Sequence, residues 1–339
     1  MNYIGQKDYS HNTKPRVAVL LTNLGTPASP TTKDLRVYLK EFLSDPRVVE
    51  VPRLLWLLIL NLIILRIRPK KSAKLYKSIW TEMGSPLMSN TIEQKDMLEE
   101  KFKLLDKSII IDFAMRYGKP TIEEKLHTLQ NTGADKILIL PLYPQYSGAT
   151  SGSTFDAVSK VFSKNRWVPN IRFISSYHDH KEYIDACVKQ INNFWTKNSK
   201  PEKLILSYHG VPKKYLTKGD PYYCHCQKTS RLISEHLDFK KENIITTFQS
   251  RFGNEEWLKP YTDETLKEMG NKGISSINVF CPGFSSDCLE TLEEIAVENK
   301  NYFMEAGGKS YSYIPALNSE SIHIEALYSL IKENIDNWI

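Results

Sequence analysis

The sequence is poor in the features that mark exported or membrane-spanning proteins. It has only five cysteines in 339 residues, an odd number in a chain too large to depend on disulfides, which favours a reducing compartment. Residues 1–15 are polar and lack the apolar core and cleavage site of a signal peptide. We therefore expect a cytoplasmic protein, open to peripheral attachment at the inner face of the membrane.

Glycine-rich phosphate-binding patterns are also missing. The chain has neither Gly-x-Gly-x-x-Gly nor a complete Walker-type Gly-x-x-x-x-Gly-Lys-Ser/Thr motif, which argues against dinucleotide or nucleotide chemistry. The formal net charge is only +6 and the basic residues are dispersed, so no nucleic-acid partner is expected. An acidic small molecule or an anionic membrane surface suits this charge better.

The longest apolar run begins at Leu54 and ends at Leu65. It is shorter than the roughly 20 residues that span a bilayer. A basic cluster follows directly, made of Arg66, Arg68, Lys70, Lys71 and Lys74. Such a helix can lie in a membrane interface or line the mouth of a pocket for a hydrophobic ligand. A buried core helix and a dimer interface explain the run as well, and the chain is expected to be a monomer or a homodimer.

Strand-like and helix-like runs alternate along the chain. Short apolar runs predict strands at 17–22, 109–115, 136–142, 171–175, 203–208, 244–248, 276–280 and 310–314. Helical patterns lie between them, at 32–43, 92–104, 121–130, 182–195, 229–237, 287–299 and 319–332. This order predicts an α/β fold with parallel sheets covered by helices.

Two strand exits carry residues suited to chemistry. His209 follows the strand at 203–208 and precedes a Gly-Val-Pro turn, which places an imidazole at the carboxyl end of a strand, where α/β sheets bind ligands. After the strand at 276–280, Asp287, Glu290 and Glu294 are spaced to share one face of a helix. These carboxylates facing a histidine predict proton transfer or transient binding of a divalent cation. The simpler explanations are a core histidine and a helix start in which Asp287 and Glu290 form a capping box.

Ordered motifs along the chain resemble those of ferrochelatases, the terminal enzymes of haem synthesis. The similarity runs from about residue 17 to residue 330 and is carried by Asn23-Leu24-Gly25-Thr26-Pro27, residues 38–47, Gly84-Ser85-Pro86-Leu87, Met115-Arg116-Tyr117-Gly118, Tyr143-Pro144-Gln145-Tyr146-Ser147, Ser207-Tyr208-His209-Gly210, Gln249-Ser250-Arg251-Phe252-Gly253 and residues 282–295. The resemblance implies two similar Rossmann-like lobes with the active-site cleft between them. We expect an N-terminal lobe at 1–160, a C-terminal lobe at 161–315, and a terminal helix at 316–339 that packs on the first lobe.

The resemblance also implies the reaction, which is insertion of Fe²⁺ into protoporphyrin IX with release of two protons. By matching position, His209 and Glu290 are the catalytic pair, and His209, Glu290, Asp287 and Glu294 are expected to handle the metal. The resemblance leaves two roles for His209, which are deprotonation of the pyrroles and delivery of the metal. Matching positions for porphyrin contacts are Leu24, Arg68, Lys71, Tyr76, Ser85, Arg116, Tyr117 and Trp257.

No cofactor beyond substrate iron is required by this reading. The carboxyl-terminal cysteine group that holds a [2Fe–2S] cluster in some ferrochelatases is missing, but the close pair Cys224 and Cys226 leaves an internal cluster as an expectation to test. The alternatives are a coproporphyrin ferrochelatase, a cobalt or nickel tetrapyrrole chelatase, and a haem or porphyrin carrier. The cobalt and nickel relatives tend to carry a second histidine where this sequence has Glu290, so Glu290 argues against them. Because a carrier needs no path for protons, His209 together with the carboxylates Asp287, Glu290 and Glu294 argues against a carrier.

Overall fold

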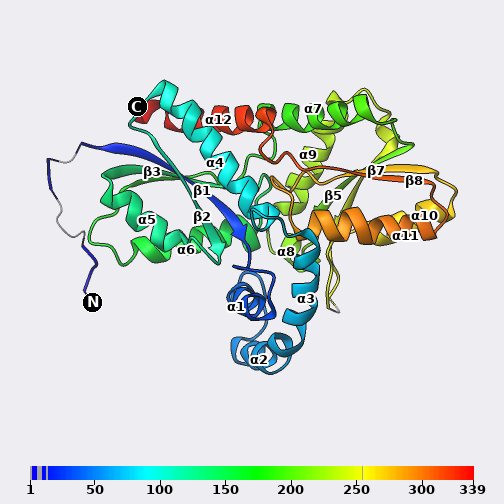
Figure 1. Cartoon of the computed structure of the whole chain (residues 1–339), viewed down its shortest axis with the longest axis horizontal. Coiled ribbons are helices and arrows are strands. Elements are labelled where there is room, and N and C mark those ends of the chain that lie inside the picture. The colour runs from blue at the N-terminus through cyan, green and yellow to red at the C-terminus, as the bar shows by residue number, and fades with distance from the viewer. Residues whose placement is uncertain (1, 6–9, 13, 254) are drawn as a thin grey trace. The chain divides into compact units, whose positions relative to one another are not determined.

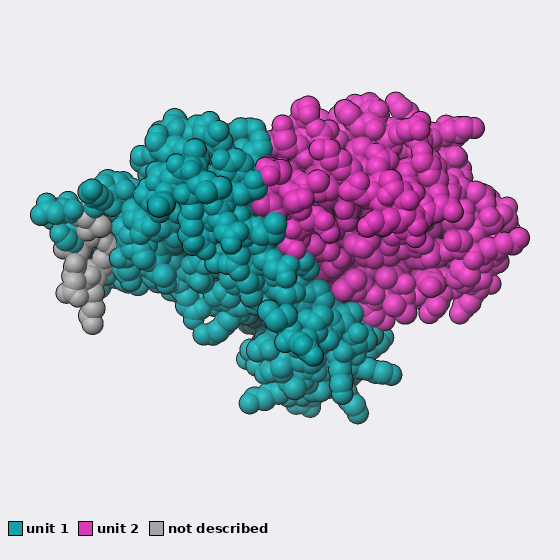
Figure 2. All heavy atoms as spheres, turned by 45° about the horizontal axis from the view of Figure 1, so that its top comes forward, with its two compact units in different colours: residues 1–142, 148–176, 327–339 teal, residues 143–147, 177–326 magenta. Residues whose placement is uncertain are grey.

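The computed structural model describes residues 2–5, 10–12, 14–253 and 255–339. The chain divides into two compact units, each built on its own four-stranded sheet (Figures 1 and 2). The first unit comprises Met1–Leu142, Gly148–Ser176 and Leu327–Ile339, and the second comprises Tyr143–Ser147 and Tyr177–Ala326.

The first unit has a parallel sheet in the order β2-β1-β3-β4. Its strands are β1 (Arg16–Gly25), β2 (Ile110–Tyr117), β3 (Ala134–Pro141) and β4 (Asn170–Phe173). Strand β1 is buried along most of its length, as expected for a central strand with helices on both faces of its sheet.

The helices of the first unit fall into two groups. The first group comes directly before or after a strand in the chain, and consists of α1 (Thr32–Leu43), α4 (Pro86–Leu105), α5 (Ile122–Asn131) and α6 (Ser153–Phe162). A π-helical turn, η2 (Gly148–Gly152), precedes α6. Between β1 and α4 the chain also forms α2 (Arg53–Ile59), the π-helical η1 (Leu60–Ile64) and α3 (Leu65–Ile79). Residue 160, the boundary expected from the sequence, lies within α6.

The second unit repeats the plan, with sheet order β6-β5-β7-β8 and parallel pairing throughout. Its strands are β5 (Lys203–His209), β6 (Ile244–Gln249), β7 (Ser276–Phe280) and β8 (Ser310–Ile314). Its helices are α7 (Lys181–Lys197), α8 (Lys213–Thr217), α9 (Tyr222–His236), η3 (Lys241–Asn243), α10 (Thr262–Asn271), the π-helix η4 (Glu290–Asn299) and α11 (Lys300–Glu305). Helix α12 (Ser321–Ile335) begins in the second unit and, with η5 (Asp336–Trp338), ends in the first.

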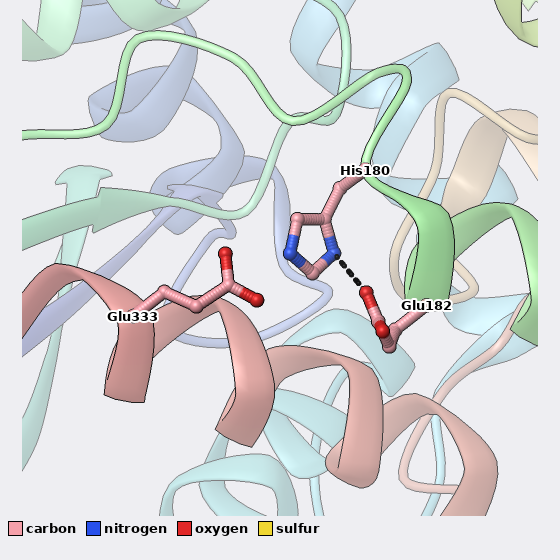
Figure 3. A group of neighbouring side chains, drawn as sticks. All are labelled: His180, Glu182 and Glu333. Carbon is pink, nitrogen blue, oxygen red and sulfur yellow. Dashed lines mark ion pairs between the residues drawn. The ribbon is translucent and has the colours of Figure 1, made fainter.

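A contact between a histidine and a carboxylate marks the start of α7. His180 is the N-cap residue of this helix, and its Nδ1 lies 3.4 Å from Oε2 of Glu182 in the first turn (Figure 3). Glu333, also drawn in Figure 3, lies on α12 in the first unit and is not part of this pair.

The predicted α/β class is confirmed, because all eight predicted strands form and both sheets are parallel and flanked by helices. The helix predicted at 287–299 differs in two ways. It begins at Leu289, which leaves Asp287 outside it, and residues 290–299 wind as a π-helix. The helix predicted at 92–104 begins earlier, at Pro86, because Ser85 caps it and proline fits the first helical turn.

The apolar run at 54–65, which we call the apolar lip, forms α2 and η1 and the first residue of α3. Only Trp56, Leu60 and Leu65 of the lip are buried, and they pack with Leu35 and Tyr38. Leu54, Leu55, Leu58, Leu62 and Ile63 are exposed, so the explanation as an ordinary core helix is wrong for this face. Among the described residues we find no helix with both the length and the apolar character needed to cross a membrane.

Candidate active site

His209 is the last residue of β5, a central strand that pairs with both β6 and β7. The strand before it is buried because both faces of the sheet are covered, and His209 itself is half-buried. Its Nδ1 lies 2.7 Å from the carbonyl oxygen of Gly210. A carbonyl only accepts, so this contact assigns the proton of the neutral ring to Nδ1. The lone pair of Nε2 is then available to take a proton or to bind a metal.

Two hydrogen bonds hold the turn after His209. The N–H of Gly210 donates to the carbonyl of Gln249 at 2.7 Å, and the hydroxyl of Tyr222 donates to the carbonyl of His209 at 2.9 Å. A Cβ at Gly210 would lie 2.8 Å from that Gln249 oxygen and 3.1 Å from Cε3 of Trp257. Only glycine fits at this position, and the packing fixes where the imidazole leaves the strand.

The π-helix η4 arranges the acidic residues. In a π-helix the backbone bonds run from i to i+5, so a turn takes more residues than in an α-helix. Residues four apart therefore fall into one stripe, and the buried residues Thr291, Ile295 and Asn299 have this spacing. Glu290, Glu294 and Glu298 have the same spacing, one position earlier along the chain. Their stripe replaces the i, i+3, i+7 face expected for an α-helix.

Both oxygens of the Glu294 carboxylate accept a hydrogen bond from the same residue, Ser250. The N–H of Ser250 donates to Oε1 at 2.7 Å, and the hydroxyl of Ser250 donates to Oε2. Burial raises the pKa of Glu294 to about 7, with repulsion from Glu290 and Glu298 acting in the same direction and the bonds from Ser250 acting against it. The carboxylate thus lies near the balance point between its charged and neutral forms at neutral pH.

Glu294 opens onto a cavity of about 200 Å³ in the second unit. The cavity carries three acidic side chains, Asp263, Glu294 and Glu298, against one cation, Arg251, which is itself paired with Asp263 at 3.2 Å. The other residues around it are Phe248, Gln249, Ser250, Thr262, Asn299 and Tyr302. An acidic hollow beside Glu294 is suited to the passage of a hydrated cation.

Asp287 occupies a different environment. Its Oδ1 accepts hydrogen bonds from Thr291 at 2.8 Å and Tyr313 at 2.6 Å, and its Oδ2 accepts one from the amide of Asn318 at 2.7 Å. It is buried, and these bonds tie the start of η4 to the segment after β8. Its expected role in metal handling remains a prediction.

The four residues expected to handle metal do not form a closed coordination site. Among the described residues, no three of His209, Asp287, Glu290 and Glu294 bring their ligand atoms within 4.8 Å of one another. This arrangement differs from a structural metal site, in which several ligands surround the ion.

The first unit contains seven of the eight residues expected to contact porphyrin. Arg116 and Tyr117 lie at the end of β2. The guanidinium of Arg116 donates to Asp45 at 2.5 Å and to Ser153, so much of its charge is balanced within the protein.

The other predicted porphyrin contacts differ in exposure. Leu24, Tyr76 and Tyr117 pack in one apolar cluster with the base of the lip. Ser85 is buried as the N-cap of α4, while Arg68 and Lys71 are exposed on α3. In the second unit, Trp257 packs on Gly210, next to His209, and its buried indole N–H has no hydrogen-bond acceptor among the described residues.

The cysteines do not fit a cluster that uses both Cys224 and Cys226. These residues lie two apart on α9, where side chains do not face each other, and Cys224 is exposed while Cys226 is fully buried. Burial raises the pKa of Cys226, and also those of Cys187, Cys281 and Cys288.

Four residues with central positions were not singled out from the sequence. Gln249 ends β6 and pairs with His209, and Ser250 follows it and donates to Glu294. Tyr222 donates to the carbonyl of His209, and Asp45 accepts hydrogen bonds from Arg116 and Tyr117. Except for Tyr222, they lie in motifs that carried the resemblance to ferrochelatases. Their partners are distant in sequence, so spacing alone gives no signal for these contacts.

Comparison with known proteins gives the family. The family model described as Ferrochelatase matches residues 16–335. Curated relatives named ferrochelatase include those of Marinobacter nauticus, 57% identical over 100% of this chain and 92% of the relative, and Idiomarina loihiensis, 56% identical over 100% and 93%.

Solved structures support the fold. SirB from Bacillus subtilis, solved with Fe³⁺, has a TM-score of 0.56 at 13% identity and covers 95% of this chain and 96% of its own. CbiX, described as the terminal enzyme of sirohaem biosynthesis in denitrifying bacteria, has a TM-score of 0.51 at 11% identity, with coverage of 93% and 98%. The likeness to these two proteins concerns the fold alone. The match over nearly the whole length, at more than half identity, shows that this chain belongs to the ferrochelatase family, whose members are metal chelatases.

Proposed function

We propose that this protein inserts Fe²⁺ into protoporphyrin IX to give protohaem, the last step in the synthesis of haem b. Two observations carry the proposal together. The chain matches curated ferrochelatases along its whole length, and His209 stands at a strand exit with Nε2 free to act. The substrates are protoporphyrin IX and Fe²⁺, and the products are haem and two protons.

His209 and Glu290 are the proposed catalytic pair. Two pyrrole N–H protons must leave as the metal enters, so the site needs a base that can pass protons on. The Nε2 lone pair of His209 can accept such a proton, and the acidic stripe of η4 offers carboxylates to receive protons in turn. The same Nε2 suits metal delivery, and both assignments place His209 at the reacting centre.

Glu290, Glu294 and Asp287 are proposed to handle the metal with His209. Carboxylates and imidazole bind Fe²⁺ without the strong retention that thiolates give. The absence of a closed ligand set among the described residues supports transfer in preference to storage. The cavity beside Glu294 gives hydrated iron a place to approach.

The proposed porphyrin contacts supply apolar faces and cations. Leu24, Tyr76 and Tyr117 offer apolar and aromatic surface, and Trp257 offers a ring beside His209. Arg116 is largely neutralised by Asp45, so we assign the binding of propionates mainly to the exposed cations Arg68 and Lys71. Ser85 also remains among the proposed contacts.

The apolar lip is proposed to contact the membrane peripherally. Leu54 is 82% exposed and Leu58 is 59% exposed, and the basic residues of α3 follow them. Apolar side chains next to cations are typical of segments that lie in the interface of an anionic membrane. This contact would shorten the path of a hydrophobic porphyrin through water, and it favours protoporphyrin over the more acidic coproporphyrin as substrate.

The proposal uses no iron–sulfur cluster. Cys224 and Cys226 face different environments on α9, and we derive no step of the reaction from them. The visible spectrum of the isolated protein tests this point, because a bound cluster absorbs in the visible before any porphyrin is added.

The decisive experiment is anaerobic incubation of the purified protein with Fe²⁺ and protoporphyrin IX, followed by absorbance. We expect haem to form with the wild type and not with His209→Ala, while the variant remains folded by circular dichroism. His236→Ala, which changes an exposed histidine on α9, is the matched control. Binding of porphyrin without haem formation by the wild type would contradict the proposal and favour a carrier or another metal.

A further inference from the structure

Ser250 has an unusual backbone conformation at the end of β6. Its φ is 66°, and Asn318 is the only other non-glycine residue in the described part of the chain with a positive φ. This left-handed region is unfavourable for side chains with a Cβ, although glycine enters it freely. Such strain persists where the surrounding structure gains from it, commonly at functional sites.

The conformation lets one residue hold a carboxylate with two donors. The N–H of Ser250 points to Oε1 of Glu294 at 2.7 Å, and its hydroxyl points to Oε2 of the same group. A glycine would relieve the strain and keep the N–H, but it would lose the hydroxyl. The serine is therefore explained by the second hydrogen bond and not by the turn.

Residue 249 connects the same turn to the other parts of the site. Gln249 pairs with His209 across β5 and β6. Its Nε2 donates to the carbonyl of Glu290 at 3.3 Å, and its Oε1 accepts from Ser207 at 2.8 Å. The end of β6 thus contacts both the strand that carries His209 and the π-helix that carries Glu290 and Glu294.

We propose that Ser250 is a positioning residue for the metal, which holds the Glu294 carboxylate in one orientation so that iron meets a preset ligand on its way to the porphyrin. This inference rests on the proposed function of the acidic stripe in handling Fe²⁺. Each oxygen of Glu294 accepts one hydrogen bond from Ser250, so the carboxylate cannot rotate, and each oxygen keeps a second lone pair for an ion. Fe²⁺ therefore meets this ligand in a defined place.

The test uses the full chain and Fe²⁺ alone as the probe. Ser250→Ala removes the hydroxyl and keeps the strained backbone, and we expect about tenfold weaker Fe²⁺ binding by anaerobic calorimetry, the size typical of a lost partner to a metal ligand. In turnover, the KM for Fe²⁺ should rise by a similar factor while the KM for porphyrin stays unchanged. Ser163→Ala, at an exposed serine of the first unit, is the matched control.

Two further variants separate the hydroxyl from the strain. Ser250→Gly should bind Fe²⁺ as weakly as Ser250→Ala while unfolding at a temperature no lower than the wild type, and it provides the answer if the alanine variant fails to fold. Ser250→Asn should recover most of the affinity, because asparagine tolerates this backbone region and its amide can donate to Glu294. Wild-type Fe²⁺ affinity in both the Ala and the Gly variants would overturn the proposal.

The binding measurement also separates this inference from the proposed function. If the wild type forms no haem while the Ser250 variants bind Fe²⁺ more weakly than it does, the proposed function is overturned and the positioning role is supported. A wild type that forms haem, with Ser250 variants of unchanged Fe²⁺ affinity and KM, would overturn the positioning role alone.

Discussion

The hydroxyl of Tyr117 donates a hydrogen bond to the carboxylate of Asp45 at 2.8 Å. The same oxygen accepts bonds from Arg116 at 2.5 Å and from Ser153 at 2.6 Å. Burial acts to raise the pKa of Asp45, but these bonds, a bond from the N–H of Arg47 and the charge of Arg116 outweigh it and hold the pKa below its usual range. One carboxylate thus fixes two residues expected to contact porphyrin.

Replacing Asp45 with asparagine should destabilise the first unit. The change leaves Arg116 without its counter-charge and turns one acceptor of three hydrogen bonds into a mixed donor and acceptor. We expect a loss of about 2–3 kcal/mol in the free energy of unfolding, seen by calorimetry as a lower unfolding temperature. Asp156→Asn, which removes an exposed ion pair with Arg47, should change stability by less than about 1 kcal/mol. Equal effects of the two variants would contradict a special role for Asp45.

Replacing Glu290 with glutamine should slow metal insertion without unfolding the protein. The variant keeps the shape of the side chain and loses its charge and its ability to accept a proton. The rate should fall by about 100-fold or more, as for other lost proton-transfer groups. Haem formation under saturating substrates measures this, with Glu305→Gln at an exposed position of α11 as the control. An unchanged rate would show that Glu290 contributes to the structure of the helix and not to catalysis.

Protonation of His323 should make the free energy of unfolding depend on pH. This histidine is fully buried, its Nδ1 bonds to the carbonyl of Asn318 at 2.6 Å, and burial lowers its pKa from 6.5 to about 4. As the pH falls below 6.5, the unfolded chain binds a proton at this histidine before the folded protein does, so the free energy of unfolding decreases until about pH 4. The full decrease is about 3 kcal/mol.

Urea unfolding between pH 7 and pH 4 measures this dependence. His323→Gln cannot titrate, so its stability should fall less steeply with decreasing pH, and the gap between the two proteins should narrow in acid. Parallel curves for wild type and variant would contradict the assignment, and His11→Gln, at an exposed position near the N-terminus, is the matched control.

Exchanging Leu54, Leu58 and Leu62 for serine should weaken binding to anionic vesicles. These side chains are exposed, so the change removes apolar surface available to lipid while leaving the buried residues of the lip in place. Turnover with detergent-solubilised porphyrin should change much less than vesicle binding measured by sedimentation. Leu104→Ser, at a 90% exposed position on α4, is the control. Unchanged vesicle binding together with a loss of dimers would assign the lip to a subunit interface.

The sequence alone determined the order of the elements and the place of His209. The apolar runs of β1 to β8 and the Gly-Val-Pro turn after β5 are local patterns, and local patterns are enough to predict parallel strands that alternate with helices. The ordered motifs also gave the family, which the comparisons confirmed.

Only the tertiary structure decided which side chains meet. The π-helical winding of η4 placed Glu290, Glu294 and Glu298 in one stripe, and the positive φ of Ser250 aimed two donors at Glu294. Asp287 lay outside the helix and was enclosed by hydrogen bonds from distant segments, and the lip was exposed on one face and not buried throughout. These outcomes depend on contacts between residues far apart in the chain, and a local sequence pattern carries no information about such contacts. The sequence therefore predicted the order of strands and helices, while tertiary packing set the geometry of the site.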